Sequence, residues 1–457
     1  MNQLIDGAGT RSRIVIVGAG YVGYHCARQL ERRLPREAAD IVIVSPADYM
    51  PYTSLLPQVG AGTLDPRHIA VSLSGTLRRT RHVPGHAVAV DFTNRSLTVA
   101  GPDGQRRELT WHRLVLTPGG VSRTLPLPGI VEQAKGFNNI AEAVYLRDHV
   151  LGQLVLAAAS DDPAQRQARC TFVVAGAGTT GTEVAAQGQL FTRAALRHYP
   201  RIRPGELRWL LVDHAPAILP ELDPRLAGSA LRILRRRGLD VRLNTSIEEV
   251  TGSQVRLSDG TSVPTRTLVW AVGVTPGPLT QALGLGTVKG RIVVDEFLTV
   301  PGHPDVFAAG DAAAAPDLTR PGELTAMTAQ HAQRQGKAIA RNLAATLGHG
   351  TRQPYQHRDL GAVVDLGGWQ AVANPLHVPV SGPLASLITR GYQLYALPAG
   401  RLRVATDWLT DIIEHRQLVR LGLIPSQYSG LTAAEHTDIY DQSDGQPIDR
   451  QRQASTT

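Results

Sequence analysis

Two glycine-rich turns in the sequence have the spacing that binds the pyrophosphate of a dinucleotide. Both read GxGxxG, one in Gly18–Gly23 and the other in Gly176–Gly181. The first glycine of such a turn permits a tight bend, the second lets the backbone approach a phosphate, and the third lets a helix pack closely on a strand. The N-terminus of that helix offers free N–H groups and partial positive charge to the phosphates. We therefore expect one chain to bind two dinucleotides. The six glycines are Gly18, Gly20, Gly23, Gly176, Gly178 and Gly181.

Polar residues after the second strand of each unit are candidates for contacts with a ribose. In the first unit, the position after Ile41–Val44 that usually holds an acid is Ser45, and Asp48 follows in the same stretch. Ser45 or Asp48 would bond the ribose hydroxyl; the alternative is that the stretch is simply a turn. In the second unit the corresponding residue is Asp213. An acid there accepts hydrogen bonds from the ribose of NADH and repels the extra phosphate of NADPH; the alternative is a loop carboxylate.

The elements around the turns form an internal repeat. Arg13–Gly23 (RIVIVGAGYVG) is matched by Thr171–Gly181 (TFVVAGAGTTG), and Leu114–Gly120 (LVLTPGG) is matched by Leu268–Val274 (LVWAVGV), at nearly the same offset. Each turn follows an apolar run of strand length and precedes a helical pattern. Continuous apolar strands indicate parallel sheets that are covered by helices on both faces. The sequence thus predicts an α/β protein with two Rossmann-like nucleotide-binding units.

The rest of the chain predicts further strands, helices and a small additional sheet. Strands are expected to end at Gly310–Asp311, and a helix is expected over Thr328–Leu347. Residues alternate over Asp359–Val380, which indicates a small antiparallel sheet. Amphipathic helices are expected over Leu384–Tyr395 and Leu402–Leu421.

The composition excludes several classes of protein. Of 457 residues, 42% are hydrophobic and 19% are charged, so global disorder is excluded. Cys26 and Cys170 are the two cysteines; they form no CxxC pair, are too few for an iron–sulfur cluster, and are interpreted as buried apolar residues. The net charge of +8 comes from dispersed arginines without a basic block, which argues against a nucleic-acid partner. No metal site is expected.

The sequence has no run of ~18 consecutive apolar residues, so we expect no helix that spans a bilayer. The N-terminus lacks an apolar run and does not resemble a secretory signal. We therefore expect a cytoplasmic protein, soluble or attached to a membrane from one side, and not a charge-translocating pump.

Two dinucleotide sites in one chain favour a pair of cofactors that face each other. The economical pair is FAD, which is tightly bound, and NADH, which exchanges as a substrate. A hydride would pass from the nicotinamide to the flavin, and the electrons would leave to a second acceptor. The cofactor carries that chemistry, and the protein positions and tunes it.

On these motifs the sequence resembles the two-dinucleotide-binding flavoproteins, which have a glutathione-reductase-like fold. Within them it is most similar to the type II NADH dehydrogenases, the non-pumping NADH:quinone oxidoreductases. The resemblance covers roughly residues 13–421. The glycine motifs identify the superfamily, whereas the Ala-Gln element and the C-terminal extension point to the family. The motifs are GAGYVG (Gly18–Gly23), YTSLLPQVGAGTLDP (Tyr52–Pro66), GAGTTGTEVA (Gly176–Ala185), AAGDAAA (Ala308–Ala314) and TAQHAQRQGK (Thr328–Lys337).

The resemblance implies a peripheral enzyme of the respiratory chain that oxidises NADH through FAD and reduces a membrane quinone. Asp311 would hydrogen-bond FAD, and Ala329 would line the flavin. Gln330 would line the flavin and the quinone pocket, with Gln333 nearby. The implied cofactor-binding residues are Gly18, Gly20, Val22, Gly23, Ser45, Asp311, Ala329, Gly176, Gly178, Thr179, Thr180, Gly181, Glu183, Asp213 and Gly273.

Glu183, with Gln330, completes the implied catalytic set, and each has a structural alternative. Glu183 would contact NADH, or it is an exposed acid in the first turn of a helix, where the helix dipole favours it. Gln330 would face the quinone, or its amide bonds the backbone. His331 is left out as a structural histidine. The amino-acid sequence of Tyr49–Ser54 departs from the family pattern, which leaves the type of quinone open.

The expected organisation has four parts, a homodimeric assembly and a membrane-facing surface. The C-terminal helices combine an apolar stripe with arginines, as helices that lie on a membrane do, so we expect attachment to the cytoplasmic face of the cell membrane. The alternative is that the stripes pack on the core or on a dimer partner. The parts are an FAD-binding domain (12–145 and 291–355), an NADH-binding domain (146–290), a C-terminal sheet with amphipathic helices (356–430) and a disordered tail (431–457).

Two other functions stay open at this point. One is a soluble NAD(P)H-dependent reductase for ferredoxin or another electron carrier. The other is a non-catalytic NADH-binding flavoprotein that acts as a scaffold. Disulfide reduction and sulfide:quinone reduction are disfavoured, because Cys26 and Cys170 lie in expected core elements and cannot pair.

Overall fold

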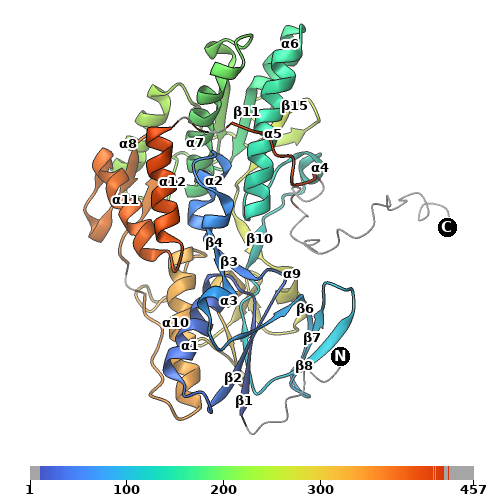
Figure 1. The fold of residues 1–457 in the computed structure, drawn as a ribbon, viewed down its shortest axis with the longest axis vertical. Helices are drawn as coiled ribbons and strands as arrows, with labels where there is room; N and C mark the ends of the chain where they lie inside the picture. Colours follow the sequence, from blue (N-terminus) through green and yellow to red (C-terminus); the bar gives the residue numbers. More distant parts are fainter. Residues whose placement is uncertain (1–10, 358, 415, 417, 427–430, 432–457) are drawn as a thin grey trace, which may run out of the picture.

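The computed structural model describes residues 11–357, 359–414, 416, 418–426 and 431. The chain forms two stacked lobes with a smaller C-terminal part against their side (Figure 1). We call the part built on the six-stranded sheet the first lobe and the part built on the four-stranded sheet the second lobe.

The first lobe contains a mainly parallel sheet whose central strand is the apolar run before the first glycine turn. β1 is buried from its second residue to its end. β2 and β9 flank β1 and run parallel to it. Further out, β5 runs parallel to β2, and β22 runs parallel to β9. The edge strand β21 pairs antiparallel with β22. In order across the sheet the strands are β21 (Thr299–Val300), β22 (His303–Ala308), β9 (Arg113–Leu116), β1 (Ser12–Val17), β2 (Ala39–Ser45) and β5 (Arg81–Pro84).

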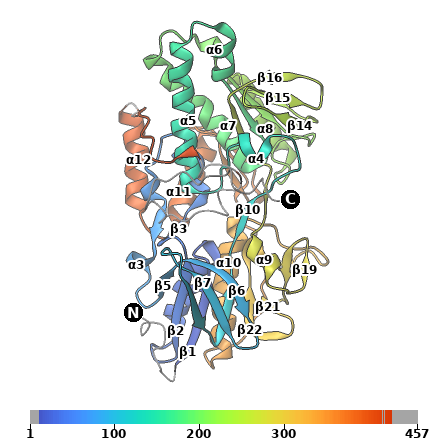
Figure 2. The ribbon, with the colours of Figure 1, turned by 90° about the vertical axis from the view of Figure 1, so that its right-hand side faces the viewer.

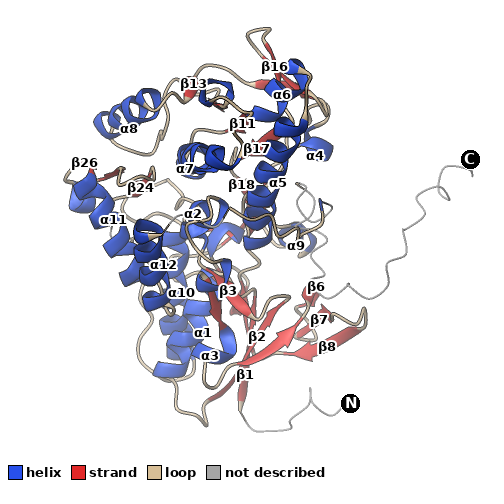
Figure 3. Ribbon diagram, turned by 45° about the horizontal axis from the view of Figure 1, so that its top comes forward, coloured by secondary structure: helices blue, strands red, loops and turns tan. Residues whose placement is uncertain are grey.

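Two layers cover this sheet. The helices α1 (Tyr21–Arg33) and α10 (Ala329–Thr346) pack side by side on one face. A three-stranded antiparallel sheet lies on the other side, as Figures 1 and 3 show. The helix predicted over Thr328–Leu347 is therefore confirmed. The covering strands are β6 (His86–Asp91), β7 (Ser96–Ala100) and β8 (Arg106–Thr110).

The second lobe repeats the arrangement on a smaller scale. Its four strands are all parallel, and β11, the strand before the second glycine turn, is buried along its whole length. An antiparallel sheet of β14, β15 and β16 is appended to this lobe. The four parallel strands are, in order, β13 (Asp240–Arg242), β12 (Arg208–Val212), β11 (Thr171–Ala175) and β17 (Thr267–Trp270); the helices include α5 (Ile140–Ala159), α7 (Thr179–Ala195) and α8 (Pro224–Arg236), and the appended strands are Ile247–Val250, Gln254–Leu257 and Ser262–Pro264.

Two short strands connect the lobes and pair with each other. β10 (Gly120–Ser122) leads out of the first lobe, and β18 (Val274–Pro276) leads back. The two strands are antiparallel, with Val121 opposite Thr275. Figure 2 shows β10 between the stacked lobes. The prediction of two parallel-sheet units, each starting with a glycine turn, is confirmed.

The third glycine of each turn has no room for a side chain. A Cβ on Gly23 would lie 1.9 Å from the carbonyl oxygen of Gly18, and a Cβ on Gly181 would lie 1.9 Å from that of Gly176. Gly18 and Gly176 have φ of +95° and +98°, which side chains rarely tolerate. The close contact between helix and strand is thus available to glycine alone.

The C-terminal part consists of a small antiparallel sheet and two helices. The strands β24 (Val363–Asp365), β25 (Ala371–Ala373) and β26 (Val380–Gly382) confirm the sheet that the alternation predicted. The helix α11 (Pro383–Ala396) matches its prediction as well. Figure 3 shows α11 and α12 on the same side of the molecule as α10.

The second helix, α12, is shorter than predicted. It covers Arg401–Ile413 and not Leu402–Leu421, because Glu414 is extended and ends it. Beyond that point Arg416 pairs with Asp411 and donates a hydrogen bond to the carbonyl of Ala61, which turns the chain back toward the core. Of the tail predicted to be disordered over 431–457, Leu431 is described and is buried in the second lobe, which corrects that start, and residues 432–457 lie outside the described residues.

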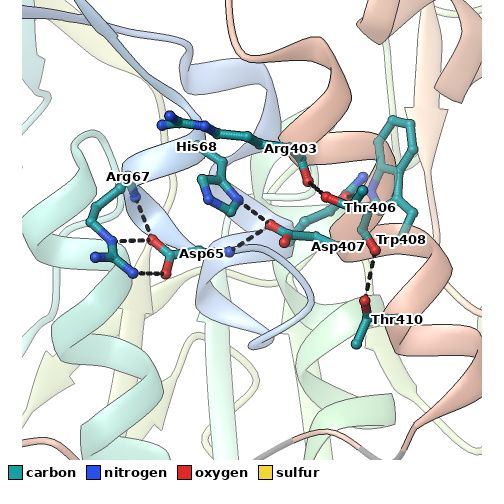
Figure 4. Close-up of polar contacts among 9 residues, drawn as sticks. Asp65, Arg67, His68, Arg403, Thr406, Asp407, Trp408 and Thr410 are labelled. Carbon is teal, nitrogen blue, oxygen red and sulfur yellow. Dashed lines mark hydrogen bonds and ion pairs between the residues drawn. The ribbon is translucent and has the colours of Figure 1, made fainter.

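Polar contacts fix α12 to α2 (Leu56–Gly60) and to the segment that follows it (Figure 4). One carboxylate oxygen of Asp407 lies 2.6 Å from Nδ1 of His68 and accepts a hydrogen bond from the backbone N–H of Asp65 at 3.1 Å. One position along the helix, Nε1 of Trp408 donates to the side-chain oxygen of Gln58 at 2.6 Å. The inner face of α12 is therefore held by directional bonds as well as by apolar packing.

Replacing Gly181 by alanine should destabilise the protein, because the new methyl group overlaps a backbone oxygen that cannot move without distorting the turn. We expect Gly181→Ala to lower the free energy of unfolding by about 1–3 kcal/mol, measured as the shift of the urea midpoint without ligands. Gly228→Ala in α8 is the matched control, since a Cβ there meets nothing within 4 Å, and it should stabilise the helix by about 0.5–1 kcal/mol. Equal midpoints for the two variants would contradict the packing role.

Candidate functional site

A large cleft separates the two lobes and reaches the C-terminal part. Its volume is about 1360 Å³, more than the ~300–1,000 Å³ that holds one small molecule. Most of the cofactor candidates lie on its wall. The wall residues among them are Gly20, Val22, Gly176, Gly178, Thr179, Thr180, Glu183, Asp213, Gly273, Asp311, Ala329, Gln330 and Gln333.

The N-termini of α1 and α7 open directly onto the cleft. Their N-cap residues are Gly20 and Gly178, and neither helix has a side chain that caps its free N–H groups. A Cβ at either glycine would meet no atom within 4 Å, so there is open space beside the backbone. Uncapped N–H groups at a helix N-terminus are donors that a phosphate can satisfy. Each lobe therefore presents one site for a pyrophosphate.

Four candidates lie behind the wall. Gly18, Gly23 and Gly181 shape the turns through the close contacts described above. Ser45, at the end of β2, is buried, and its hydroxyl accepts a bond of 3.3 Å from the N–H of Ala47. This bond is the one expected from the turn interpretation of that stretch.

Asp311 presents a carboxylate to the cleft without a hydrogen-bond donor of its own. It lies in the 3-10 turn Gly310–Ala312, after β22. Burial raises the pKa of Asp311, and the charge of Arg291 opposes that rise. Within the described part of the chain no group donates a hydrogen bond to this carboxylate. A half-buried acceptor of this kind suits a donor, such as a hydroxyl of a bound ligand.

Asp213 organises the end of β12 and also faces the cleft. Its two carboxylate oxygens accept hydrogen bonds from the backbone N–H groups of Ala177, in the glycine turn, and of Ala215. Nδ1 of His214 lies 3.1 Å away. The loop-carboxylate interpretation describes the contacts of Asp213 within the protein, and the residue also lines the cleft, as the ribose interpretation requires.

Glu183 is buried and is not an exposed helix acid. Its side chain lies in α7 and the residue is 9% exposed. Oε1 accepts a hydrogen bond of 2.7 Å from the N–H of Asp365 in β24. Burial, and then the charge of Asp365, raise the pKa of Glu183 well above its usual value. The alternative of a solvated first-turn acid is therefore wrong.

The Ala-Gln element forms the first turn of α10. Ala329, Gln330 and Gln333 line the cleft. The amide of Gln330 donates a hydrogen bond of 2.9 Å to the carbonyl of Gly361, so the backbone-bonding interpretation describes its contact within the protein. That bond fixes the side chain at the point where α10 meets the C-terminal sheet.

His331 belongs to a buried aromatic cluster. Its Nδ1 lies 2.9 Å from the hydroxyl of Tyr355, and its ring stacks on His357 at 3.8 Å between centroids. Burial, and then His357, lower the pKa of His331 to about 4. A neutral, packed imidazole agrees with its omission from the catalytic set.

Sequence reasoning missed a group of tyrosines at the end of the cleft nearest α11. Tyr21, Tyr52 and Tyr392 line the cleft there. The rings of Tyr21 and Tyr52 are 5.7 Å apart, and the hydroxyl of Tyr52 donates to the side-chain oxygen of Gln393 at 2.8 Å. Burial raises the pKa of all three phenols, so they stay neutral. The available signal was the tyrosine within the first glycine turn, at Tyr21.

The two cysteines do not form a redox pair. Cys26 and Cys170 are free and fully buried, as predicted. Burial raises the pKa of Cys170 to about 11 and raises that of Cys26 further. Among the described helices none is long and apolar enough to cross a membrane.

Comparisons with known proteins agree with this geometry. Residues 12–336 match the family of pyridine nucleotide-disulphide oxidoreductases. The chain is 31% identical over 412 residues to the type II NADH:quinone oxidoreductase NdhA of Mycobacterium tuberculosis, covering 87% of this chain and 86% of that protein.

The chain belongs to the type II NADH:quinone oxidoreductases.

Other relatives support the assignment. A type II NADH:quinone oxidoreductase of Staphylococcus aureus is 26% identical and covers 83% of this chain and 94% of that protein. The solved structure of NDH2 from Plasmodium falciparum in complex with NADH superposes with a TM-score of 0.82 at 16% identity, covering 89% of this chain and 99% of the other. As a type II oxidoreductase, the chain shares the fold of the disulphide reductases without their paired thiol.

Removing the carboxylate of Asp311 should weaken the binding of flavin. A hydrogen bond to a charged acceptor contributes about 1.5–3 kcal/mol, so Asp311→Ala should raise the Kd for FAD by about 10–100-fold. The measurement is reconstitution of the flavin-free protein, followed by absorbance.

Asp317→Ala is the matched control for Asp311→Ala. Asp317 also lines the cleft, but one oxygen of its carboxylate, Oδ1, already accepts hydrogen bonds from the backbone N–H and the hydroxyl of Thr319. This control should bind FAD as the parent does. Tight binding by Asp311→Ala would remove Asp311 from the flavin site.

Proposed function

We propose that the protein binds FAD in the first lobe and NADH in the second lobe, on either side of the cleft. It oxidises NADH and reduces a membrane quinone, without pumping protons. The observation that carries the proposal is one continuous cleft. It joins two uncapped helix N-termini and extends to the tyrosines beside α11. A donor cofactor and a hydrophobic acceptor can therefore meet one flavin from different sides. The proposed domain boundaries at residues 145, 290 and 355 correspond to this assignment. Residues 12–145 and 291–355 would bind FAD, residues 146–290 would bind NADH, and the C-terminal part follows.

The residues of the first lobe fit FAD. The turn at Gly20 and the uncapped start of α1 suit its pyrophosphate, and the free carboxylate of Asp311 suits a ribityl hydroxyl. FAD, when bound, accepts a hydride from NADH and passes two electrons to the quinone. The cleft would hold FAD between the lobes. Ser45 and Val22 complete the proposed contacts near the adenosine and the phosphates.

The second lobe is proposed to bind NADH. Its pyrophosphate would lie at Gly176–Gly181, with the N–H groups of Thr179 and Thr180 at the start of α7. Asp213 is already fixed by two backbone bonds, so a charged oxygen is held in place for the ribose hydroxyls. The same charge would repel a phosphate at that ribose, which favours NADH over NADPH. Gly273 leaves open space at the crossing.

The quinone is proposed to bind at the end of the cleft nearest α11, away from the proposed NADH site. There the neutral rings of Tyr21, Tyr52 and Tyr392 provide an apolar lining with polar tips, which suits a quinone ring. Gln330 and Gln333 face the same space from α10. Gln330 is held by its bond to Gly361, so its position on the cleft wall is fixed.

The C-terminal helices are proposed to lie on the cytoplasmic face of the membrane. One face of α12 is buried through Val404 and Trp408, and the other is apolar but exposed. Burying ~500 Å² of such surface in the interface would contribute about 12 kcal/mol before ordering costs. Arg401 and Arg403 are exposed nearby and suit anionic lipids. The exposed apolar residues are Leu384, Leu387, Tyr395, Leu402, Leu409, Ile412 and Ile413, between 54% and 82% exposed.

A homodimer is part of the same proposal. Two copies would present both sets of C-terminal helices to one membrane. Size-exclusion chromatography with light scattering would give the oligomeric state.

The function is tested by anaerobic half-reactions of the flavin-loaded protein. NADH should bleach the flavin absorbance, and a menaquinone or ubiquinone analogue should restore it. Restoration by a ferredoxin and by no quinone would favour an electron-carrier reductase. Bleaching without reoxidation by either would favour a scaffold.

The NADH assignment adds a variant to that assay. Asp213→Ala should lower kcat/KM for NADH by about 10–100-fold, since it removes hydrogen bonds to a charged acceptor, and should discriminate less against NADPH. Asp240→Asn, on the neighbouring strand β13 and away from the cleft, is the control with unchanged kinetics. An unchanged KM for NADH in Asp213→Ala would remove the ribose contact.

The membrane assignment predicts a loss of binding to vesicles. Leu409→Glu, Ile412→Glu and Ile413→Glu in one chain should reduce co-sedimentation with anionic vesicles by at least about 100-fold, because each side chain contributes about 1.5–3 kcal/mol when buried. The control is Val155→Glu with Leu156→Glu, which are 45% and 47% exposed on α5. Equal sedimentation of both variants would indicate that these helices do not contact lipid.

A further inference from the structure

Asn138 lies on the wall of the cleft, on the connection that leads from β10 to α5. Its side-chain amide donates a hydrogen bond to the hydroxyl of Ser122, the last residue of β10. Among the described residues, no group donates a hydrogen bond to the side-chain oxygen of Asn138. This half-buried residue of the cleft wall therefore keeps one acceptor that a ligand can use.

Contacts of β10 place Asn138 close to the proposed flavin site of the first lobe. Gly120, the first residue of the strand, stands two positions before Ser122. A Cβ on Gly120 would lie 3.3 Å from one carboxylate oxygen of Asp311. The strand that holds the amide of Asn138 thus begins beside the carboxylate that we assign to FAD.

Contacts of β18 connect the same place to the second glycine turn. Ser122 is the register partner of Val274, the first residue of β18. Ala271, three residues before Val274, packs against the glycine turn, because a Cβ on Gly181 would lie 3.3 Å from the Cβ of Ala271. Asn138 is therefore at the junction between the proposed sites of the two cofactors. Figure 2 shows β10 at this level, between the stacked lobes.

An NADH molecule bound at the second glycine turn has to place its nicotinamide ring at this junction. Its pyrophosphate is assigned to the start of α7, and the flavin is assigned to the side of Asp311. Transfer of a hydride requires that the two rings are in contact, so the nicotinamide comes between these two points. The carboxamide of that ring carries an N–H₂ group, which an amide oxygen can accept.

The backbone of Asn138 is held by a buried acid. Glu142, in the first turn of α5, is 2% exposed, and its carboxylate accepts a hydrogen bond from the N–H of Asn138. The side chain of Asn139 accepts one of 2.9 Å from the N–H of Glu142. A Cβ on Gly136 would lie 2.8 Å from the carboxyl carbon of Glu142, so this acid has no room to move aside. A group that is fixed in advance loses little conformational entropy when it binds a ligand.

We propose that the side-chain oxygen of Asn138 accepts a hydrogen bond from the carboxamide of the nicotinamide, with Ser122 and Glu142 as positioning residues. This inference rests on the proposed function for the location of NADH. It assigns recognition of the ring to Asn138, whereas Asp213 is assigned to the ribose at the other end of the dinucleotide. The two contacts can therefore be measured separately.

A dinucleotide that lacks the carboxamide N–H₂ tests the proposal. The reduced 3-acetylpyridine analogue of NADH has a methyl group in that place and cannot donate the hydrogen bond. The measurement is the second-order rate constant for anaerobic bleaching of the flavin. Asn138→Ala should lower this constant about 5–10-fold for NADH and less than about 2-fold for the analogue. Because each ring is compared with itself in the parent protein, the different reactivity of the two rings cancels.

Gln133→Ala is the matched control for the loss of an amide. Gln133 ends α4 (Ile130–Gln133) on the same connection and is exposed to solvent, so this variant should keep the parent's preference for NADH. An equal fall for NADH and for the analogue in Asn138→Ala would show a merely structural role and would overturn the proposal. A higher Kd for FAD with an unchanged preference would place Asn138 against the flavin and would overturn it as well.

Ser122→Ala provides a second variant that leaves Asn138 in the chain. It removes the hydroxyl that orients the amide, so the preference for NADH should narrow about 2–3-fold. If Asn138→Ala does not fold, an unchanged preference in Ser122→Ala overturns the proposal.

Calorimetric titration of the flavin-loaded protein separates this inference from the proposed function. The Kd values for NAD⁺ and for its 3-acetylpyridine analogue should differ in the parent and should approach each other in Asn138→Ala. If NADH does not bleach the flavin but the Kd values behave in this way, the proposed function fails and the contact of Asn138 stands. Equal Kd values for the two dinucleotides in the parent would overturn the contact.

Discussion

The close approach of a helix to the strand before it, at the third glycine of each turn, is the constraint on which the site depends. At Gly23 and Gly181 the helix backbone lies so near the turn that a methyl group would overlap a carbonyl oxygen. This contact places the start of α1 and of α7 at the carboxyl ends of their sheets, with the N–H groups uncapped. Two uncapped helix N-termini that face one cleft provide two sites at which an anion can bind. The rest of the protein supplies walls around that arrangement.

The carboxyl groups on this cleft differ because their hydrogen-bond donors differ. Asp213 has both oxygens occupied by backbone N–H groups, which fixes the orientation of its carboxylate. Asp311 faces the cleft without a donor from the described chain, which suits a ligand hydroxyl. Glu183 has one donor and an acidic neighbour, which suits a neutral acid. Residue type alone does not distinguish these three environments.

Local patterns in the sequence predicted the parts of the fold that local physics determines. The apolar runs before Gly18 and Gly176 became central parallel strands, and the alternation around Gly368 became an antiparallel sheet. The predicted end of α12 was wrong, because Glu414 is extended and a contact between Arg416 and the distant Ala61 redirects the chain. A periodic pattern carries no signal for such a contact.

The glycine turns of the candidate site were predictable from the sequence, whereas contacts between residues that are distant in the sequence were not. Gly20, Gly178 and Asp311 lie on the cleft where their motifs placed them. The pairing of Glu183 with Asp365 joins residues 182 positions apart, and neither lies in a pattern that points to the other. The tyrosines beside α11 were missed for the same reason, since only the fold brings Tyr21 and Tyr392 to one wall.

The antiparallel pairing of the two crossings also determines how the lobes can separate. Because β10 and β18 are hydrogen-bonded to each other, they form a short spine, and a rotation of one lobe relative to the other would bend both strands together. Sliding of one lobe past the other would break the register between Val121 and Thr275. A protease cut in either crossing would leave the halves joined by the uncut strand and by the spine, so a nicked molecule should migrate as one particle until it is denatured.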